Sequence, residues 1–164
     1  MTTTTGGAAN VLSKLEDYLQ TEWPELDVYL TSVTDHYSTA SICGPNSKKI
    51  LKKIFPDKDF SDDAFPHMSY QNGKIDEINC RIMRISFTGE LSYEINIESK
   101  YGKSLWEKCI EAGKEFKITP YGTETMHLLR AEKGFIIVGQ DTDGTMTPIA
   151  VSYTHLTLPT TNSV

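Results

Sequence analysis

The stretch from Arg84 to Ile97, RISFTGELSYEINI, restricts the possible folds of this chain more than any other segment. Apolar and polar residues alternate on both sides of a central Thr-Gly-Glu, which predicts a β-hairpin whose strands each have one buried and one solvent-exposed face. Glutamate is a poor strand former, yet Glu94 stands in the middle of the second strand. A strand residue that local preference does not explain is a candidate for a functional role.

The hairpin is compatible with two strand registers, because its apolar pattern and its turn preference disagree. If the apolar faces of both strands coincide, the connecting loop is odd in length and Ser86 lies opposite Glu94. Arg84 is then diagonal to Glu94 and can orient its carboxylate. A two-residue type II′ turn at Gly-Glu instead places Phe87 on the Glu94 face. We expect the first register, because burial of apolar side chains outweighs turn preference.

The other periodic segments predict an α+β domain in which helices pack on an antiparallel sheet. Helical spacing of apolar residues predicts helices at 10–23, 44–55, 99–113 and 121–134. Runs rich in β-branched and aromatic residues predict strands at 26–33 and 37–43. The dipeptide Asn72-Gly73 is the strongest short signal for a hairpin turn in the chain.

Composition argues against several classes of partner and location. The net charge of −6 argues against nucleic acid or an anionic membrane surface as a partner. No stretch has the length and hydrophobicity of a membrane-spanning helix, and the first residues do not resemble a signal peptide, so we expect a cytoplasmic protein. Cys43, Cys80 and Cys109 are widely spaced among apolar residues, which predicts three buried, reduced thiols.

Residue spacing supports neither a metal site nor a covalent nucleophile. The segment GQDTDGT at 139–145 has some features of a calcium loop, but Met146 and Ser152 stand where such a loop needs glycine and glutamate. The four histidines include no i,i+4 pair, and no serine or cysteine has a base at a recognisable spacing. We therefore predict no metal site, and the catalytic residues stay unassigned.

The last residues, 151–164, differ from the rest of the chain. Serine, threonine and proline dominate this segment, which has no aspartate, glutamate, lysine or arginine. Its first part closely resembles one reading frame of a sequencing-library adapter. We expect a partial domain at 1–150 followed by a non-native or disordered tail at 151–164.

Two stretches resemble the aminomethyltransferase family, which includes the T-protein of glycine cleavage. FTGELSYEI is similar to the family's folate-binding hairpin, aromatic-Thr-Gly-Glu-x-x-x-Glu, and LRAEKGFIIVGQDTDGTMTP is similar to the Arg-x-Glu…Gly-x-Asp segment that follows it. Together with MTTTTGGAA and ITPYGTETMH, they resemble the branch formed by the folate domains of heterotetrameric sarcosine oxidases. The likeness runs from Met1 to Pro148 and implies the folate-binding fold of this family, truncated at both ends.

The resemblance implies binding of tetrahydrofolate and capture of the one-carbon unit from oxidative demethylation of sarcosine, as 5,10-methylenetetrahydrofolate. Three residues match folate-site positions of the family: Glu94 a pterin-binding glutamate, Phe87 an aromatic pocket residue, and Arg84 a preceding arginine. The family's catalytic aspartate lies upstream of the matched region, so we expect these 164 residues to be inactive alone. FAD, FMN, NAD and further subunits are implied for the complete enzyme, not for this region.

Three other interpretations stay open. The glycine-cleavage aminomethyltransferase carries out related chemistry, but that branch has an arginine where this chain has Met126. A folate-binding iron–sulfur maintenance factor has the same fold, but its signature has a cysteine where Phe135 follows Lys133-Gly134. The third is a folded but inactive structural piece.

Overall fold

Alternating apolar residues bring four segments of the chain together in an antiparallel sheet. The structure is a computed structural model, and it describes residues 1–147. Its strands, in the spatial order β1-β4-β3-β2, are β1 (Tyr37–Cys43), β2 (Tyr70–Ile75), β3 (Ile78–Met83) and β4 (Ser92–Glu98). Its α-helices are α1 (Ala8–Thr21), α2 (Ser47–Ile54), α3 (Gly102–Gly113) and α4 (Thr123–Glu132).

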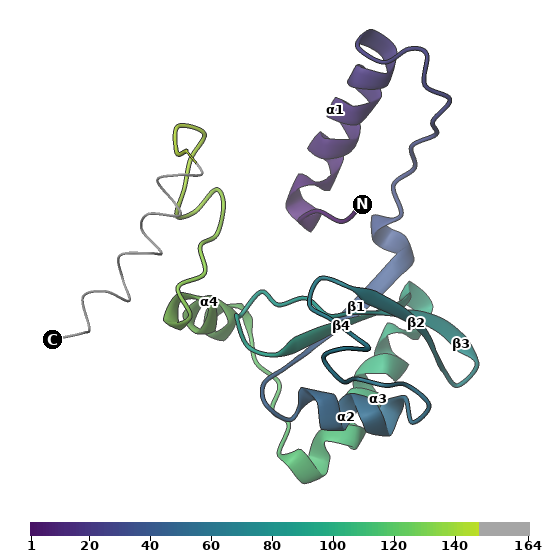
Figure 1. The fold of residues 1–164 in the computed structure, drawn as a ribbon, viewed down its shortest axis with the longest axis vertical. Helices are drawn as coiled ribbons and strands as arrows, with labels where there is room; N and C mark the ends of the chain where they lie inside the picture. Colours follow the sequence, from purple (N-terminus) through teal and green to yellow (C-terminus); the bar gives the residue numbers. More distant parts are fainter. Residues whose placement is uncertain (148–164) are drawn as a thin grey trace, which may run out of the picture.

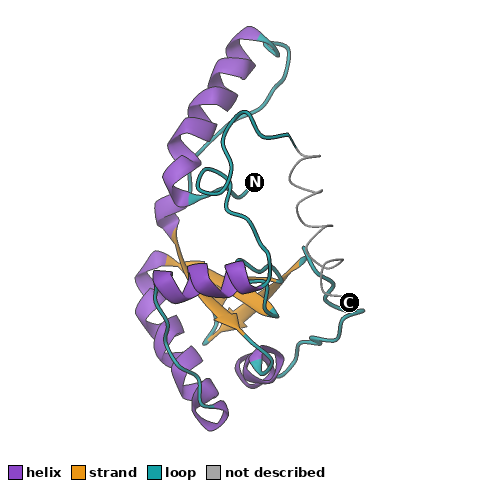
Figure 2. Cartoon of the chain, turned by 90° about the vertical axis from the view of Figure 1, so that its left-hand side faces the viewer, coloured by secondary structure: helices purple, strands orange, loops and turns teal. Residues whose placement is uncertain are grey.

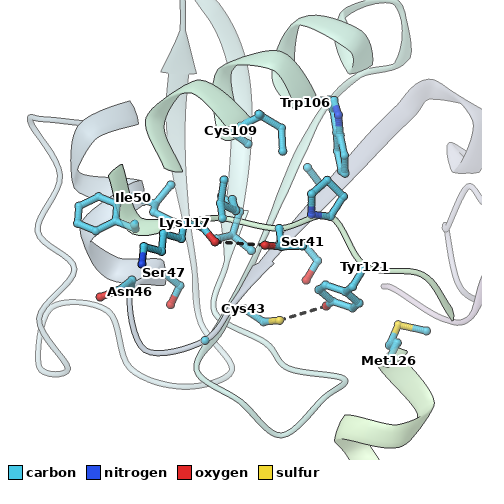
Figure 3. Close-up of a pocket in the computed structure, with 18 of the residues that line it drawn as sticks. Ser41, Cys43, Asn46, Ser47, Ile50, Trp106, Cys109, Lys117, Tyr121 and Met126 are labelled. Atoms are coloured by element: carbon cyan, nitrogen blue, oxygen red, sulfur yellow. Dashed lines mark hydrogen bonds between the residues drawn. The ribbon is translucent and has the colours of Figure 1, made fainter. Parts of the chain in front are cut away.

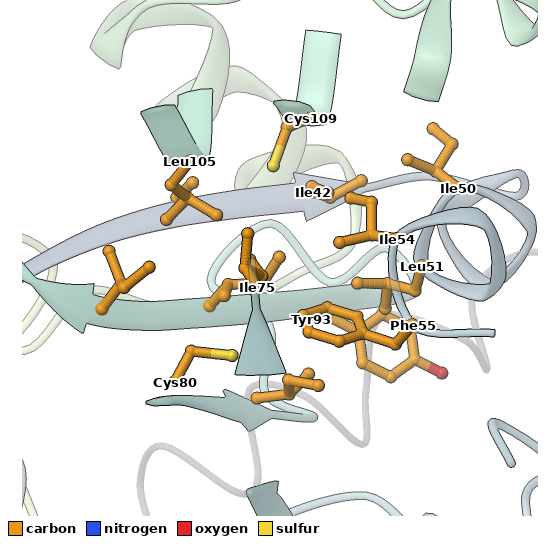
Figure 4. Packing of buried hydrophobic residues seen from close by; sticks show 14 of the residues in the cluster. Ile42, Ile50, Leu51, Ile54, Phe55, Ile75, Cys80, Tyr93, Leu105 and Cys109 are labelled. Carbon is orange, nitrogen blue, oxygen red and sulfur yellow. The ribbon is translucent and has the colours of Figure 1, made fainter. Parts of the chain in front are cut away.

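The pairing register separates apolar and polar side chains onto two faces of the sheet. Ile95 of β4 pairs with Ala40 of β1 and with Ile82 of β3, and all three are buried. Ile97 pairs in the same way with Cys80. Because paired residues point to the same side of a sheet, these side chains contribute to one core (Figure 4). We call this apolar side the inner face and the opposite side the outer face.

Helices α2 and α3 cover the inner face of the sheet (Figure 1). The lysines of α2 lie on its outer side, so that Ile50, Leu51 and Ile54 are buried together. Helix α3 buries Leu105 and Cys109 against the same core. Full burial of an aliphatic side chain contributes roughly 1.5–3 kcal/mol, so these apolar stripes are sufficient to dock both helices on the sheet.

Aromatic rings anchor the segment between α2 and β2. Phe60 and Phe65 both pack on the buried ring of Tyr93, with ring centroids 5.9 Å and 5.6 Å from it. Phe60 also contacts Phe55, which follows α2, at 6.5 Å. This cluster packs the segment between α2 and β2 against Tyr93 of β4.

The turn between β2 and β3 differs from the prediction. Asn72 and Gly73 lie inside β2, and the turn is formed by Asp76 and Glu77, with φ values of 49° and 67°. A Cβ atom on Gly73 would lie 3.1 Å from the Phe55 ring. Here the glycine allows the ring to pack closely on the strand, so the Asn-Gly signal does not indicate the turn.

The predicted strand at 26–33 is wrong, because residues 22–33 contain no strand in the structure. A strand needs a hydrogen-bonded neighbour, and none of the strands described in residues 1–147 pairs with this segment. Helix α1, which precedes it, stands away from the sheet (Figure 2). None of the α1 residues is fully buried, and Tyr29 in the following segment is 92% exposed.

The α+β class, with helices packed on an antiparallel sheet, is confirmed. The expected helix ends are also present: α3 ends at Gly113, and Gly134, with φ of 73°, follows α4. Cys80 and Cys109 are buried as predicted, whereas Cys43 is half-buried. The predicted tail at 151–164 lies outside the described residues. Among residues 1–147, no helix has the length and hydrophobicity needed to cross a membrane.

Candidate functional site

The outer face of the sheet is polar where β1 and β4 pair. Ser41 lies opposite Glu94, and Cys43 lies opposite Ser92. The hydroxyl oxygens of Ser41 and Ser92 are 3.3 Å apart, which is within hydrogen-bond distance. The strand alternation that buries the inner face therefore presents hydroxyls, a thiol and a carboxylate together on the outer face.

Glu94 is the half-buried carboxylate of this face. Its side chain has no hydrogen-bond or ion-pair partner among the residues that the structure describes. Burial raises the pKa of Glu94, because the charged form loses hydration without gaining a compensating charge. A carboxylate in this state has free lone pairs and can accept two hydrogen bonds from a ligand.

Neither of the two predicted hairpin registers is correct. Met83 pairs with Glu94, β3 ends there, and residues 84–91 form a loop between the strands. The inner-face residues of β3 are Cys80 and Ile82, which precede the stretch that was expected to be the first strand. Burial of this earlier apolar pair sets the register, and it decides which residues neighbour the carboxylate.

Phe87 lies in the 84–91 loop and packs against α4. Its ring meets the imidazole ring of His127 nearly edge-on, with centroids 6.0 Å apart and an interplanar angle of 73°. Phe87 is 41% exposed, so part of its ring is accessible to a ligand. The Nδ1 atom of His127 is buried and has no hydrogen-bond partner in the described part of the chain. Sequence analysis missed His127, because a single histidine without a spaced partner gives no signal.

A close backbone contact joins the same loop to the end of α4. Gly89 has φ of +76°, and a Cβ atom there would lie 2.6 Å from the Cβ atom of Lys133. The Lys133 ammonium is 3.2 Å from the carboxylate of Glu90. The glycine and the glutamate of the Thr-Gly-Glu motif therefore both contact Lys133, which directly follows α4.

Arg130 and Asp141, at the two ends of the second motif, contact each other. The Arg130 guanidinium donates to the Asp141 carboxylate and, at 2.9 Å, to the carbonyl oxygen of Phe135. The Ile137 N–H donates to Asp141 at 2.8 Å. This N–H, and then the Arg130 hydrogen bond, hold the pKa of Asp141 below its usual range. These hydrogen bonds thus stabilise the conformation of residues 135–141, which follow α4.

Arg84 lies on the inner side of the sheet, away from Glu94. Its guanidinium donates to the Phe65 carbonyl oxygen at 2.6 Å and pairs with the Asp62 carboxylate at 2.7 Å. Burial raises the pKa of Tyr93, an inner-face residue, and the nearby charge of Arg84 opposes that shift. The predicted diagonal contact between Arg84 and Glu94 is therefore wrong, since strand alternation puts the two side chains on opposite faces.

A cavity of about 490 Å³ follows the edge of β1 that does not pair with β4 (Figure 3). Ser41, Cys43 and Tyr121 line its polar part, and Trp106 is among its apolar lining residues. The Cys43 thiol donates a hydrogen bond of 3.1 Å to the Tyr121 hydroxyl. Glu94 is not among the described residues that line the cavity, so the cavity adjoins the carboxylate site through β1 rather than containing it.

Metal ligation finds no support in the described part of the chain. No group of three or more histidine, cysteine, aspartate or glutamate residues in 1–147 is arranged to hold a metal ion. Asp141, which lies in the segment 139–145 with features of a calcium loop, accepts hydrogen bonds from Arg130 and from the Ile137 N–H. Glu94 is therefore the carboxylate of this region that can accept hydrogen bonds from a ligand.

Comparison with known proteins identifies the family to which the sequence is similar. The sequence matches the GCVT N-terminal domain over residues 1–157. It is 61% identical over 149 residues to the sarcosine oxidase subunit alpha of Corynebacterium sp. strain P-1, covering 90% of this chain and 15% of that protein. It is 41% identical over 155 residues to the sarcosine oxidase subunit alpha of Rhizobium meliloti, covering 93% of this chain and 16% of that protein.

A second class of relative matches the chain at lower identity. The aminomethyltransferase of Thermoanaerobacter sp. strain X514 is 33% identical over 127 residues, which cover 77% of this chain and 34% of that protein. The chain thus spans about one sixth of the sarcosine oxidase subunits that it matches. Since the family match covers nearly the whole sequence and the α+β architecture agrees with it, the chain belongs to the family of the GCVT N-terminal domain.

Proposed function

We propose that this chain is the tetrahydrofolate-binding region of a sarcosine oxidase alpha subunit. In this role it receives the one-carbon unit from oxidative demethylation of sarcosine, which leaves as 5,10-methylenetetrahydrofolate. One observation carries the proposal: Glu94 is a half-buried carboxylate without a partner in the described residues, on the polar face of the sheet. Burying a carboxylate without a hydrogen-bond partner reduces the stability of the fold, and a ligand that donates hydrogen bonds to it offsets this cost.

The Glu94 carboxylate suits the edge of a pterin ring. That edge offers an N3–H and a 2-amino group as adjacent donors, and an ionised carboxylate can accept both hydrogen bonds at once. We assign Phe87, whose ring is 41% exposed, to the aromatic wall beside the pterin. We assign Arg84 an indirect part, since it holds the Phe65 carbonyl and Asp62 beneath the loop that carries Phe87.

When bound, tetrahydrofolate supplies N5 as the nucleophile for the one-carbon unit. The residues of this chain bind and orient the ligand, and positioning of this kind contributes a large part of such a rate enhancement. The carboxylate expected to manage protons belongs to the family's upstream region. The chain spans about one sixth of the sarcosine oxidase subunits that it matches, so we expect the 164 residues alone to show no sarcosine oxidation and no methylene transfer.

Identity to the relatives favours sarcosine oxidase over aminomethyltransferase. The sarcosine oxidase subunits reach 61% and 41% identity, against 33% for the aminomethyltransferase. The proposal includes FAD, FMN and NAD bound by other parts of the complete enzyme, association with further subunits, and a cytoplasmic location. Aminomethyl transfer is the alternative, and turnover assays of the complete subunit with sarcosine or an aminomethyl donor separate the two.

The proposal is tested by measuring binding of 5-formyltetrahydrofolate, a stable reduced folate, to the complete subunit and to its Glu94→Gln variant. Loss of a charged hydrogen bond costs about 2 kcal/mol, so we expect the dissociation constant to rise by about thirtyfold. Glu98→Gln is the matched control, because Glu98 lies on the same strand and face but is exposed and pairs with Lys100 at 3.0 Å. Equal affinities of wild type and Glu94→Gln would overturn the assignment.

A further inference from the structure

Tyr121 approaches the Glu94 site from the segment between α3 and α4. Its hydroxyl accepts the Cys43 thiol hydrogen bond at 3.1 Å, and the ring is 37% exposed. Figure 3 shows Cys43 and Tyr121 linked in this way beside Ser41, with Met126 of α4 nearby. Tyr121 therefore joins the end of the edge strand β1 to the chain that enters α4.

The Tyr121 hydroxyl is also linked to the residue that faces Glu94. Ser41 lies directly opposite Glu94 across β1 and β4, and directly paired residues have Cβ atoms about 5 Å apart. Ser41 and Tyr121 line the same part of the cavity, and the Ser41 hydroxyl lowers the pKa of Tyr121. Burial first, and then the Cys43 hydrogen bond and the charges of Cys43 and Glu94, raise the pKa of Tyr121 above its usual range. Ser41 thus lies beside Tyr121 in the cavity and opposite Glu94 across the strand pair.

The position of Tyr121 in the chain extends this link to the aromatic wall. Helix α4 begins at Thr123, shortly after Tyr121, and carries His127, whose ring packs on Phe87. The hydrogen bond between Cys43 and Tyr121 thus attaches the start of α4 to β1, and the contact between Phe87 and His127 attaches the 84–91 loop to the same helix. Glu94 lies in β4 and Phe87 in the 84–91 loop. Tyr121 affects the position of both, because it holds α4, which contacts Phe87, against β1, which pairs with β4.

We propose that Tyr121 is a positioning residue of the folate site, which holds α4 and Ser41 in place so that Glu94 and Phe87 can engage one pterin ring. This inference rests on the proposed folate-binding function and deepens it. It assigns a role to a phenol that sequence analysis did not single out. The chemical class of the ligand stays the same, a reduced pterin with adjacent donors.

A double-mutant cycle in the complete subunit tests the inference. Dissociation constants for 5-formyltetrahydrofolate are measured for wild type, Tyr121→Phe, Glu94→Gln and the double variant. Tyr37→Phe is the matched control, because Tyr37 lies opposite Glu98 at the far end of the same strand pair. Ser41→Ala is a second probe that removes the hydroxyl between Tyr121 and the Glu94 position and leaves the phenol intact. Thermal unfolding of each variant confirms that it is folded.

Tyr121→Phe and Ser41→Ala are each expected to weaken binding by about fivefold, the effect of one neutral hydrogen bond. In the Glu94→Gln background the same Tyr121→Phe change is expected to weaken binding by less than about twofold, because residues that act together are not additive. Tyr37→Phe is expected to bind like wild type. A purely structural role of Tyr121 would make the two losses additive.

The outcomes separate this inference from the function on which it rests. If Glu94→Gln weakens binding while Tyr121→Phe and Ser41→Ala bind like wild type, the positioning role is overturned and the folate site stands. Fully additive losses also overturn the positioning role. If the wild-type subunit binds no folate, or Glu94→Gln binds like wild type, the proposed function fails and the inference fails with it.

Discussion

Met83 pairs with Glu94 across β3 and β4, and this pairing places the carboxylate on the face of the sheet opposite the core. The neighbouring pair, Ile82 and Ile95, is fully buried on the other face. Shifting β4 by one residue would move Glu94 into the core and Ile95 out of it. The same burial that stabilises the sheet therefore determines where the carboxylate stands.

Replacing Glu94 by Gln is expected to stabilise the unliganded protein while it weakens folate binding. Burial holds the pKa of Glu94 above the ordinary value of 4.5, so the folded state binds more protons than the unfolded state between these two pKa values. Wild type therefore loses stability relative to the variant as the pH rises through that window. Urea unfolding should show the variant to be the more stable protein at neutral pH, and the difference should disappear below the unfolded-state pKa.

The control for this effect is Glu98→Gln, on the same strand and face. Glu98 is exposed and pairs with Lys100 at 3.0 Å, so its replacement should change the free energy of unfolding by less than about 0.5 kcal/mol. A difference between wild type and Glu94→Gln that does not vary with pH would contradict the explanation by burial.

Arg84→Ala is expected to destabilise the fold by about 2 kcal/mol, because the variant leaves the buried Phe65 carbonyl without its charged donor. Since Arg84 lies on the inner side, folate affinity of the folded variant should change by less than about threefold. Arg81→Ala in β3 is the matched control. Arg81 is exposed and lies 5.3 Å from the Tyr70 ring, so this variant should lose less than about 1 kcal/mol. A large loss of affinity at unchanged stability would instead indicate that Arg84 touches the ligand.

Gly89→Ala is expected to be more destabilising than Gly44→Ala. Both glycines have positive φ, +76° and +107°, so either alanine pays about 1 kcal/mol for its backbone conformation. At Gly44 nothing lies within 4 Å of the added Cβ atom, whereas at Gly89 it would lie 2.6 Å from Lys133. Overpacking adds roughly 1–3 kcal/mol, and denaturant unfolding of the two variants measures the difference. Equal losses would mean that the loop moves away from α4 at little cost.

Glu77→Gly is expected to stabilise the protein by roughly 0.5–1 kcal/mol, since glycine adopts the φ of 67° found at this turn position without strain. The variant also removes an exposed ion pair with Lys74, 3.2 Å long. Lys74→Ala removes that ion pair alone and should change the free energy of unfolding by less than about 0.5 kcal/mol. A destabilised Glu77→Gly variant would show that the turn conformation is not strained.

The sequence predicted the fold best where a pattern depends on one element alone. The alternation of Tyr93, Glu94 and Ile95 describes β4 correctly, because side-chain direction in a strand follows from the backbone. The end of α4 was also predicted from Gly134, because its left-handed conformation, with φ of 73°, stops the helix. Local physics is sufficient at these places.

Prediction failed where the outcome depends on a distant partner. The Asn72-Gly73 signal placed the turn wrongly, because the glycine is required by the packing of Phe55 from another element. The strand expected at 26–33 has no neighbour to pair with among the described strands. The hydrogen bond from Cys43 to Tyr121 joins residues far apart along the chain, and no local sequence pattern predicts it.

By itself, the sequence determined that Glu94 stands on the polar side of a strand and that the chain resembles a folate-binding family. Only the tertiary structure decided its neighbours, placing Met83 and Ser41 beside the carboxylate and Arg84 on the opposite side. The physical reason is that strand register follows from burial of the inner face against α2 and α3, which no short stretch of sequence contains.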